Sequence, residues 1–131
     1  MTRVLIDTCA WIDFFKSKTG ALGNLVAELI ETNQAAITGV VIAELLQGVK
    51  QEKESRRLRV LFHSIYYLPT EDNDRFNAGQ LAQQLRVKGI TLPLTDVLIA
   101  VIAQRYALPV LTLDKHFQHL PVNSFGGFKK R

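Results

Sequence analysis

Cysteine and long apolar runs are both scarce in this chain of 131 residues. Cys9 is the only cysteine, so the chain cannot build an internal disulfide framework or a zinc site made of several thiolates. The longest uninterrupted apolar run, residues 97–103, is far too short to cross a bilayer, and Asp7 interrupts the apolar stretch that a signal peptide would need. We therefore expect a cytoplasmic protein with no membrane partner.

The rest of the composition is that of an ordinary globular protein, 47% hydrophobic and 21% charged. At this length we expect a single domain over residues 1–131, without repeats or linkers. The net charge is +4, and much of the positive charge lies in a basic segment and a short C-terminal tail at about 126–131. The basic segment consists of Lys50, Lys53, Arg56, Arg57 and Arg59. Together with an acidic pocket elsewhere, such a segment suits a polyanionic substrate that is cut with the help of a metal, but a solvated helix face accounts for the segment equally well.

Short apolar runs alternate with amphipathic segments along the chain. The runs predict strands at 3–6, 35–38, 65–68 and 110–113, and a fifth edge strand at 122–125 is left open. Helices are predicted at 9–15, 21–32, 40–49, 52–64 and 72–88, and a last one is capped by Thr95 and ends at Tyr106. Strands separated by helices pair in parallel through right-handed crossovers. The expected fold is a three-layer α/β/α domain with a short-stranded, mainly parallel central sheet.

Four acidic residues, Asp7, Glu44, Asp96 and Asp114, each follow or interrupt an apolar run. Carboxylates are rare near a core unless they are paired or bind a cation. Asp7 and Asp114 follow two parallel strands, and the helices that carry Glu44 and Asp96 begin at that same edge of the sheet. Ligands of open α/β sheets bind at this carboxyl edge. The pattern predicts a shared acidic pocket for a hard divalent cation, Mg²⁺ or Mn²⁺.

Each acid has a structural explanation when it is considered alone. Asp7 can cap the helix that follows it, Asp96 suits a first helical turn, and Asp114 suits a turn. Glu44 has no capping role inside a helix, but it can point outward to solvent. The joint occurrence of the four at one sheet edge is what favours a functional site.

Other candidate groups carry weaker signals. His116 and His119 have a spacing that zinc can use on a helix, but two imidazoles without a thiolate make an incomplete set. Cys9 has no histidine nearby in the sequence to activate it as a nucleophile. Thr8 and Thr112 lie next to or near the key acids, so their hydroxyls are candidates for supporting a metal-bound water or a phosphate.

Four segments together resemble the PIN-domain ribonucleases of the VapC toxin type. The first has an apolar strand followed by Asp7, Thr8 and a helix with Trp11, and the second has Glu44 on a helix that ends in glycine. The third and fourth are residues 94–100, around Asp96, and 111–117, in which a threonine precedes Asp114. The resemblance runs from residue 4 to about 125. The sequence departs from the pattern at His116, where many members carry another acid, and we expect that position to lie outside the innermost ligands.

The resemblance implies a metal-dependent endoribonuclease that is inhibited by a cognate antitoxin and forms homodimers. It implies that Asp7 and Asp96 are the principal ligands, that Glu44 and Asp114 bind a second ion or orient water, and that Thr112 supports the site. A phosphotransfer enzyme of the haloacid dehalogenase type would need an aspartate where Cys9 stands, and a receiver domain would need one within residues 50–60. A non-catalytic module that binds RNA or protein remains the alternative.

Overall fold

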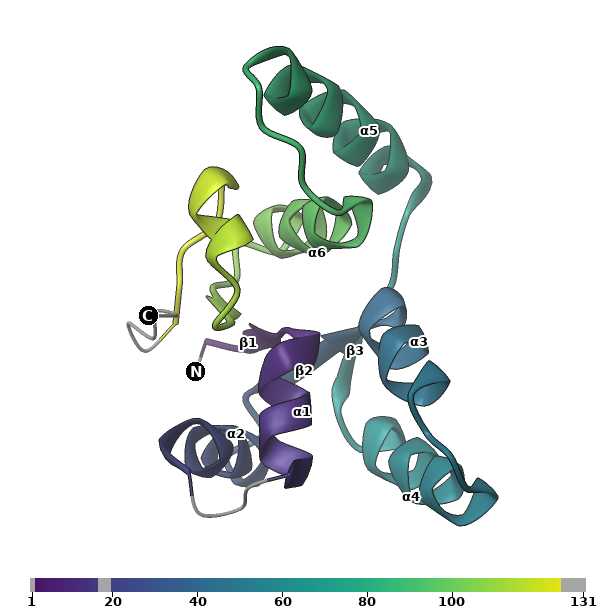
Figure 1. Cartoon of the computed structure of the whole chain (residues 1–131). Coiled ribbons are helices and arrows are strands. Elements are labelled where there is room, and N and C mark those ends of the chain that lie inside the picture. Colours follow the sequence, from purple (N-terminus) through teal and green to yellow (C-terminus); the bar gives the residue numbers. More distant parts are fainter. Residues whose placement is uncertain (1, 17–19, 126–131) are drawn as a thin grey trace.

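The structure is a computed structural model that describes residues 2–16 and 20–125, and the basic tail at 126–131 lies outside the described residues. Four parallel strands form one sheet in the order β3-β2-β1-β4 (Figure 1). They are β1 (Val4–Ile6), β2 (Ala35–Thr38), β3 (Tyr66–Leu68) and β4 (Val110–Leu111). The expected short-stranded parallel sheet is confirmed.

Helices cover both faces of this sheet. Figure 1 shows α1 and α2 below the sheet, α5 and α6 above it, and α3 and α4 beside its β3 end. Their bounds are α1 (Thr8–Lys16), α2 (Ala21–Glu31), α3 (Gly39–Gln47), α4 (Glu52–His63), α5 (Asp72–Val87) and α6 (Leu94–Arg105). The central strands β1 and β2 are wholly buried and apolar apart from Thr38, as expected for parallel strands covered on both faces. The three-layer α/β/α architecture is confirmed.

The core beneath the sheet is organised around Trp11, which has no exposed surface. Its ring packs edge-on against Phe14 and Phe62 and stacks on Phe15, with ring centroids 5.9–6.1 Å apart. Because Phe62 belongs to α4, these contacts tie α4 to α1. On the other face, α6 is apolar almost all round and buried from Val97 to Ala103 except at Leu98.

A charged cluster joins α5 to α6. The Arg105 Nε donates to Asp74 Oδ1 at 2.8 Å and its Nη2 donates to Asp74 Oδ2 at 2.9 Å, while Asp74 also accepts a hydrogen bond from the Glu71 backbone. Burial acts to raise the pKa of Asp74, but the hydrogen bonds and the charge of Arg105 outweigh it and hold that pKa below its usual value. The cluster therefore fixes the start of α5 to the end of α6.

Two predicted boundaries are wrong. The last long helix begins at Leu94 with Pro93 at its cap, so Thr95 lies inside the first turn; the Pro93 carbonyl accepts hydrogen bonds from the Asp96 and Val97 backbone. β4 stops at Leu111 because the chain turns at Thr112, whose hydroxyl accepts a hydrogen bond from the Asp114 backbone. The open possibility at 122–125 is a single parallel bridge between Ser124 and Val110, which is too short to be a strand.

The strand order determines where a ligand can bind. The chain moves from β1 outward to β2 and β3, and then returns to the other side of β1 to form β4. The connections therefore diverge at the carboxyl ends of β1 and β4, which leaves a crevice there. Asp7 follows β1, and Thr112 and Asp114 follow β4. In the part of the chain that the structure describes, no helix is long and apolar enough to cross a membrane.

Candidate active site

Asp7 lies at the end of β1 with a side chain that is almost fully buried, at 4% exposure. Its Oδ2 accepts hydrogen bonds from the Thr112 hydroxyl at 2.8 Å and from the Cys9 thiol at 3.5 Å. Burial raises the pKa of Asp7 from 3.8 to about 6; the hydrogen bonds from Thr112 and the Thr8 backbone oppose this shift, and the charge of Asp96 adds to it. Asp7 precedes α1, but its carboxylate reaches across to β4, so it does more than begin a helix.

Thr112 and Cys9 connect the two strand ends. The Thr112 hydroxyl donates to Asp7, accepts from the Asp114 backbone at 2.9 Å, and lies 3.4 Å from the Cys9 Sγ. The Cys9 Sγ also accepts a hydrogen bond from the Leu113 backbone at 3.3 Å. Burial, followed by the charge of Asp7, raises the pKa of the Cys9 thiol, so the thiol stays protonated and is not a nucleophile.

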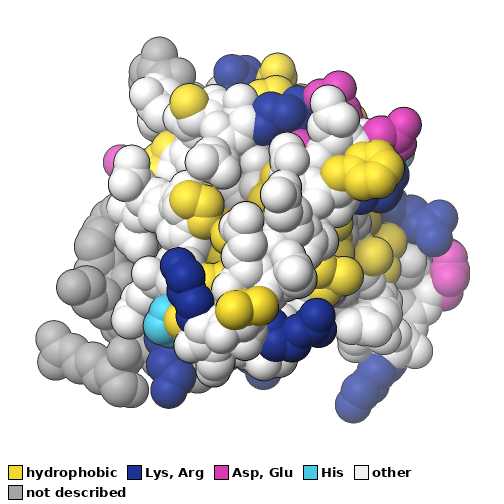
Figure 2. Space-filling view, turned by 90° about the horizontal axis from the view of Figure 1, so that it is seen from above, with side chains coloured by type: hydrophobic (Ala, Val, Ile, Leu, Met, Phe, Trp, Pro, Cys, Tyr) yellow, Lys and Arg dark blue, Asp and Glu magenta, His cyan; other side chains and the backbone are white. Residues whose placement is uncertain are grey.

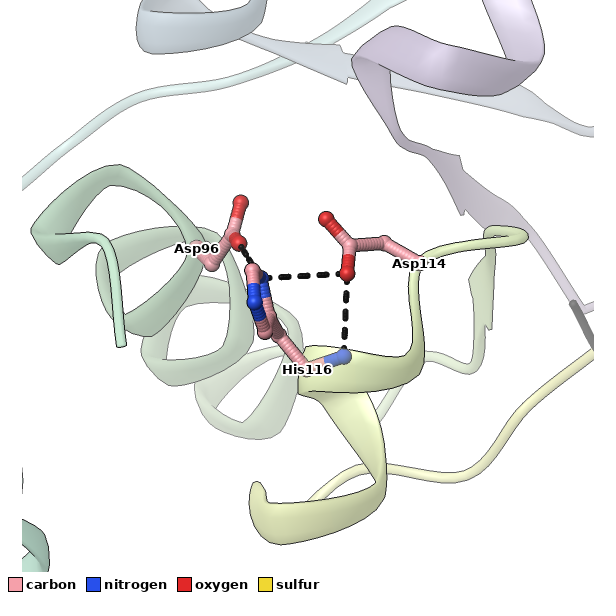
Figure 3. A group of neighbouring side chains, drawn as sticks. All are labelled: Asp96, Asp114 and His116. Atoms are coloured by element: carbon pink, nitrogen blue, oxygen red, sulfur yellow. Dashed lines mark hydrogen bonds and ion pairs between the residues drawn. The ribbon is translucent and has the colours of Figure 1, made fainter. Parts of the chain in front are cut away.

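Asp96, Asp114 and His116 form the tightest cluster at this edge (Figure 3). Asp96 comes from the first turn of α6, whereas Asp114 caps the 3₁₀ helix η1 (Lys115–His119) by accepting a hydrogen bond from the His116 backbone at 2.9 Å. The His116 Nδ1 lies 3.0 Å from Asp96 Oδ2 and 3.1 Å from Asp114 Oδ1. One donor atom from each residue lies within 4.8 Å of the other two.

The position of Asp96 makes its negative charge costly. Burial raises the pKa of Asp96, a hydrogen bond with His116 opposes that shift, and the charges of Asp114 and Glu44 raise the pKa further. Like charges held close together in a partly desolvated site destabilise one another, and a bound cation relieves this repulsion.

Glu44 reaches the site from α3. Its side chain is half-buried, and its Oε1 accepts a hydrogen bond from the Thr8 hydroxyl at 2.8 Å. Glu44 therefore does not point freely into solvent, and its charge acts on Asp96. Thr8 lies at the start of α1, so this hydrogen bond also links α1 to α3.

The four acids thus converge at one edge of the sheet, but only two of them belong to the tightest cluster. Among the described residues, the cluster with metal-ligand spacing contains Asp96 and Asp114 but neither Asp7 nor Glu44. His116 belongs to this cluster, although the sequence led us to expect it outside the innermost ligands; His119 does not belong to it. Carboxylate oxygens and an imidazole nitrogen are ordinary ligands of divalent cations, so the donor set fits such an ion.

One sequence signal accounts for the place of His116. An aspartate that caps a helix accepts a hydrogen bond from the backbone two or three residues later, which brings that residue beside the carboxylate. Asp114 caps η1 in this way, and His116 is two residues later. Asp114 therefore caps η1 and at the same time keeps its carboxylate within the cluster of Asp96 and His116.

The basic segment lies outside the acidic cluster. Lys53, Arg56, Arg57 and Arg59 are exposed on α4, and Lys50 is exposed just before it. Arg56 makes one weak, exposed ion pair with Glu52 at 3.8 Å. Arg57 and Glu44 both line a groove of about 710 Å³ between α1, α3 and α4, whose other walls are mainly apolar. The groove therefore extends from the basic helix to Glu44, while Asp7, Asp96 and Asp114 are not among its lining residues.

The PIN domain profile matches residues 4–123 of the chain. A "Ribonuclease VapC" of Rickettsia bellii is 30% identical over 97 residues, which are 68% of this chain and 72% of that protein. "Ribonuclease VapC1" of Methanocaldococcus jannaschii is 26% identical over 91% of this chain and 82% of its own length. The VapBC2 structure from Rickettsia felis, bound to a promoter DNA fragment, has a similar fold, with a TM-score of 0.78 and 22% identity over 94% of this chain and 96% of the other.

The fold and the site define an α/β domain with an acidic crevice at a topological switch point, and the donor set there fits a divalent cation. This chain belongs to the PIN-domain family. The resemblance inferred from the four sequence segments is therefore confirmed.

Proposed function

We propose that the protein is a metal-dependent endoribonuclease that hydrolyses RNA phosphodiester bonds in the cytoplasm and is the toxin of a toxin–antitoxin pair. The observation that carries this proposal is the convergence of Asp7, Glu44, Asp96 and Asp114 at the switch point between β1 and β4. The names of the related ribonucleases support the choice of RNA as substrate.

The residues of the chain have distinct roles in this reaction. Asp96 and Asp114 would hold Mg²⁺ or Mn²⁺ together with Asp7, and Glu44 would bind a second ion or orient water. When bound, the ion supplies a Lewis acid for the phosphate oxygens and a source of nucleophilic water. Thr112 holds Asp7 by its 2.8 Å hydrogen bond, and Thr8 holds Glu44 in the same way. These hydroxyls fix the carboxylates before the substrate arrives.

Cleavage of RNA by the purified protein in the presence and absence of metal tests this proposal. We expect cleavage with Mn²⁺ or Mg²⁺, none with EDTA, and none for Asp96→Asn at any metal concentration. Cleavage that persists in EDTA would contradict the metal-dependent mechanism. Binding of RNA without cleavage would favour the alternative, a non-catalytic binding module.

The groove between α1, α3 and α4 supports an antitoxin as the protein partner. Its walls include Ile12, Phe15, Leu58 and Leu61, and Glu44 is also among its lining residues. An apolar helical segment that carries a basic residue suits these walls and Glu44. The structures named VapBC, including one from Salmonella typhimurium with a TM-score of 0.76 and 20% identity over 95% of this chain and 96% of the other, support the choice of partner.

Growth of cells that express the toxin tests this partner. If a small protein is encoded next to this chain, its co-expression should restore growth, and Ile12→Glu should abolish the rescue because it places a charge in the apolar groove. Val60→Glu is the matched control, since Val60 is 73% exposed on α4 and is not among the groove-lining residues. Rescue that is insensitive to Ile12→Glu would exclude this groove.

We also propose that two copies of the chain associate as a homodimer, as the resemblance implies. Figure 2 views the face formed by α5 and shows apolar side chains among lysines and arginines. Phe76 and Val87 on α5 and Leu94 at the start of α6 are 60–79% exposed. We expect Phe76→Glu to convert a dimer to a monomer in sedimentation experiments, and a sedimentation coefficient that does not change would exclude α5 as the interface.

A further inference from the structure

His116 faces two carboxylates with one ring nitrogen (Figure 3). We infer that His116 is itself a ligand of the cation through Nδ1, and that it shifts the preference of the site from Mg²⁺ toward Mn²⁺ and other first-row transition ions. This inference rests on the proposed metal-dependent function, and it adds a ligand and an ion preference that the four acids alone do not give.

The spacing of the donor atoms fits a shared ion. Adjacent ligands of an octahedral cation bound at about 2.1 Å are roughly 3 Å apart. The His116 Nδ1 lies 3.0 Å and 3.1 Å from the Asp96 and Asp114 oxygens. An ordinary hydrogen bond has a similar length, so the distances alone do not distinguish the two arrangements.

The position of the ring nitrogen favours a ligand. The His116 Nδ1 makes a hydrogen bond with Asp96 Oδ2 at 3.0 Å, and it also lies 3.1 Å from Asp114 Oδ1, with which it makes no hydrogen bond. A cation held by both carboxylates would therefore lie within reach of this nitrogen. The backbone of His116 is fixed by its 2.9 Å hydrogen bond to Asp114 Oδ1, so the ring is held beside the site by the same residue that would share the ion.

The chemistry of imidazole sets the expected ion preference. Mg²⁺ prefers oxygen ligands and gives up water reluctantly, whereas imidazole suits first-row transition metals. The cluster combines one imidazole with two carboxylates, so Mn²⁺ gains more from it than Mg²⁺ does. Affinity should rise further from Mn²⁺ to Co²⁺, following the general order for divalent ions.

Spectroscopy and calorimetry of the full-length protein test this inference. We expect calorimetry to show tighter binding of Mn²⁺ than of Mg²⁺. We expect spin-echo EPR of the Mn²⁺ complex to show coupling to a directly bound nitrogen. His116→Ala should remove the nitrogen coupling and weaken Mn²⁺ binding by about tenfold or more. It should change Mg²⁺ binding much less, so that the ratio of the two affinities falls.

Three comparisons make the test specific. His119→Ala is the matched control, because His119 is on the same 3₁₀ helix, is exposed and is not part of the cluster. It should leave the coupling and the ratio unchanged. His116→Asp should restore Mg²⁺ binding relative to Mn²⁺, and His116→Gln, which keeps a polar side chain, should behave like His116→Ala.

The inference is wrong if the wild-type Mn²⁺ complex lacks nitrogen coupling. It is also wrong if His116→Ala tightens both ions equally, as expected for an imidazole that only neutralises the acids. The experiments distinguish a failure of the histidine ligand from a failure of the proposed ribonuclease function. RNA cleavage without nitrogen coupling would refute the histidine ligand alone, whereas nitrogen-coupled Mn²⁺ without cleavage would refute the ribonuclease alone.

Discussion

The Thr112 hydroxyl donates a 2.8 Å hydrogen bond to Asp7 Oδ2, although the two residues are 105 positions apart in the sequence. The register of the sheet explains the contact, because the last residues of the two strands, Ile6 and Leu111, are paired, and Asp7 and Thr112 directly follow them. The two strands therefore deliver a hydroxyl and a carboxylate to one point. The hydrogen bond stabilises the ionised carboxylate, while burial opposes ionisation.

Replacing Asp7 by asparagine should abolish RNA cleavage but stabilise the metal-free protein. The folded-state pKa of about 6 lies above the usual 3.8, so the native protein binds the Asp7 proton more tightly than the unfolded chain does. The ionised carboxylate therefore destabilises the fold fully above pH 6, by an amount on the order of 3 kcal/mol, and this penalty disappears below about pH 4.

Urea unfolding in EDTA measures this effect. Asp7→Asn should unfold with a free energy about 3 kcal/mol higher than wild type at pH 7.5, and the difference should shrink toward zero at pH 4. A far-UV circular dichroism spectrum checks that the fold is kept. Normal RNA cleavage by Asp7→Asn would contradict the role given to Asp7. A stability gain over wild type that is smaller at pH 7.5 than at pH 4 would contradict it as well.

Binding of Mn²⁺ should weaken as the pH falls through 6. A carboxylate must lose its proton to bind a cation, and the pKa values of Asp7 and Asp96 are both raised by burial. Affinity measured by calorimetry should therefore decrease by about tenfold for each pH unit below 6 if one of these protons is released.

Thr112→Val provides a test of the hydrogen bond in the same titration. Without the hydroxyl, the ionised form of Asp7 loses its strongest stabilising hydrogen bond, so the midpoint for Mn²⁺ binding should move to higher pH. Thr112→Ser keeps the hydroxyl and is the matched control. An identical midpoint in the valine variant would show that Thr112 does not influence the ionisation of Asp7.

The edge of the sheet at which the acids meet could be predicted from the sequence because topology alone determines it. Apolar runs followed by Asp7 and Asp114 define two parallel strand ends, and short parallel strands leave few arrangements. Helix starts were less predictable. Helix α6 begins at Leu94 with Pro93 as its cap residue, and the carbonyl of Pro93, not the hydroxyl of Thr95, accepts the first backbone hydrogen bonds.

Which polar atoms contact one another within the site depends on side-chain geometry, and the sequence pattern does not contain this geometry. The sequence placed Glu44 near the edge, but the hydrogen bond from Thr8 depends on how α1 and α3 pack together. The contact of His116 with Asp96 likewise depends on the 3₁₀ turn that follows β4. Periodicity predicts which face of an element is buried, but it does not predict which two polar atoms will meet across elements.

Replacing Arg105 by methionine should destabilise the fold without affecting the metal site. The Asp74 side chain is 1% exposed, and both of its carboxylate oxygens would lose their hydrogen bonds from Arg105. Breaking a buried ion pair by removing one partner costs about 3 kcal/mol. Because the pKa of Asp74 is depressed in the folded protein, Arg105 stabilises the fold above the unfolded value of 3.8, and the loss should shrink as the pH falls below it.

Arg75→Met is the control for Arg105→Met in chemical unfolding. Arg75 pairs with Asp72 at 2.8 Å, but the two side chains are 61% and 94% exposed, so the change should cost less than about 0.5 kcal/mol. Mn²⁺ affinity should be the same in both variants. Equal stability losses for the two arginines would show that burial of Asp74 does not determine the strength of this cluster.

Binding of RNA should depend strongly on salt through the basic segment of Lys50, Lys53, Arg56, Arg57 and Arg59. The measurement uses Asp7→Asn, which does not cleave, so that affinity is separated from catalysis. Each phosphate neutralised by a lysine or arginine releases counterions, which gives a slope of about −0.7 per contact in a plot of log affinity against log salt for single strands. Changing Lys53 and Arg59 to glutamine should therefore reduce the slope by about 1.4 if both contact phosphates.

Arg86 and Lys88 provide the matched pair for this experiment. Both are exposed at the end of α5, whereas Lys53 and Arg59 are exposed on α4, which lines the groove that includes Glu44. Changing Arg86 and Lys88 to glutamine removes the same charge from the protein, so any effect of net charge alone should appear equally in both double variants. A reduced slope only for the α4 pair would mean that RNA runs along α4 toward the acidic site. Equal slopes in both variants and in the parent protein would mean that the basic segment is a solvated helix face, and the contacts that bind RNA would then have to lie elsewhere on the chain.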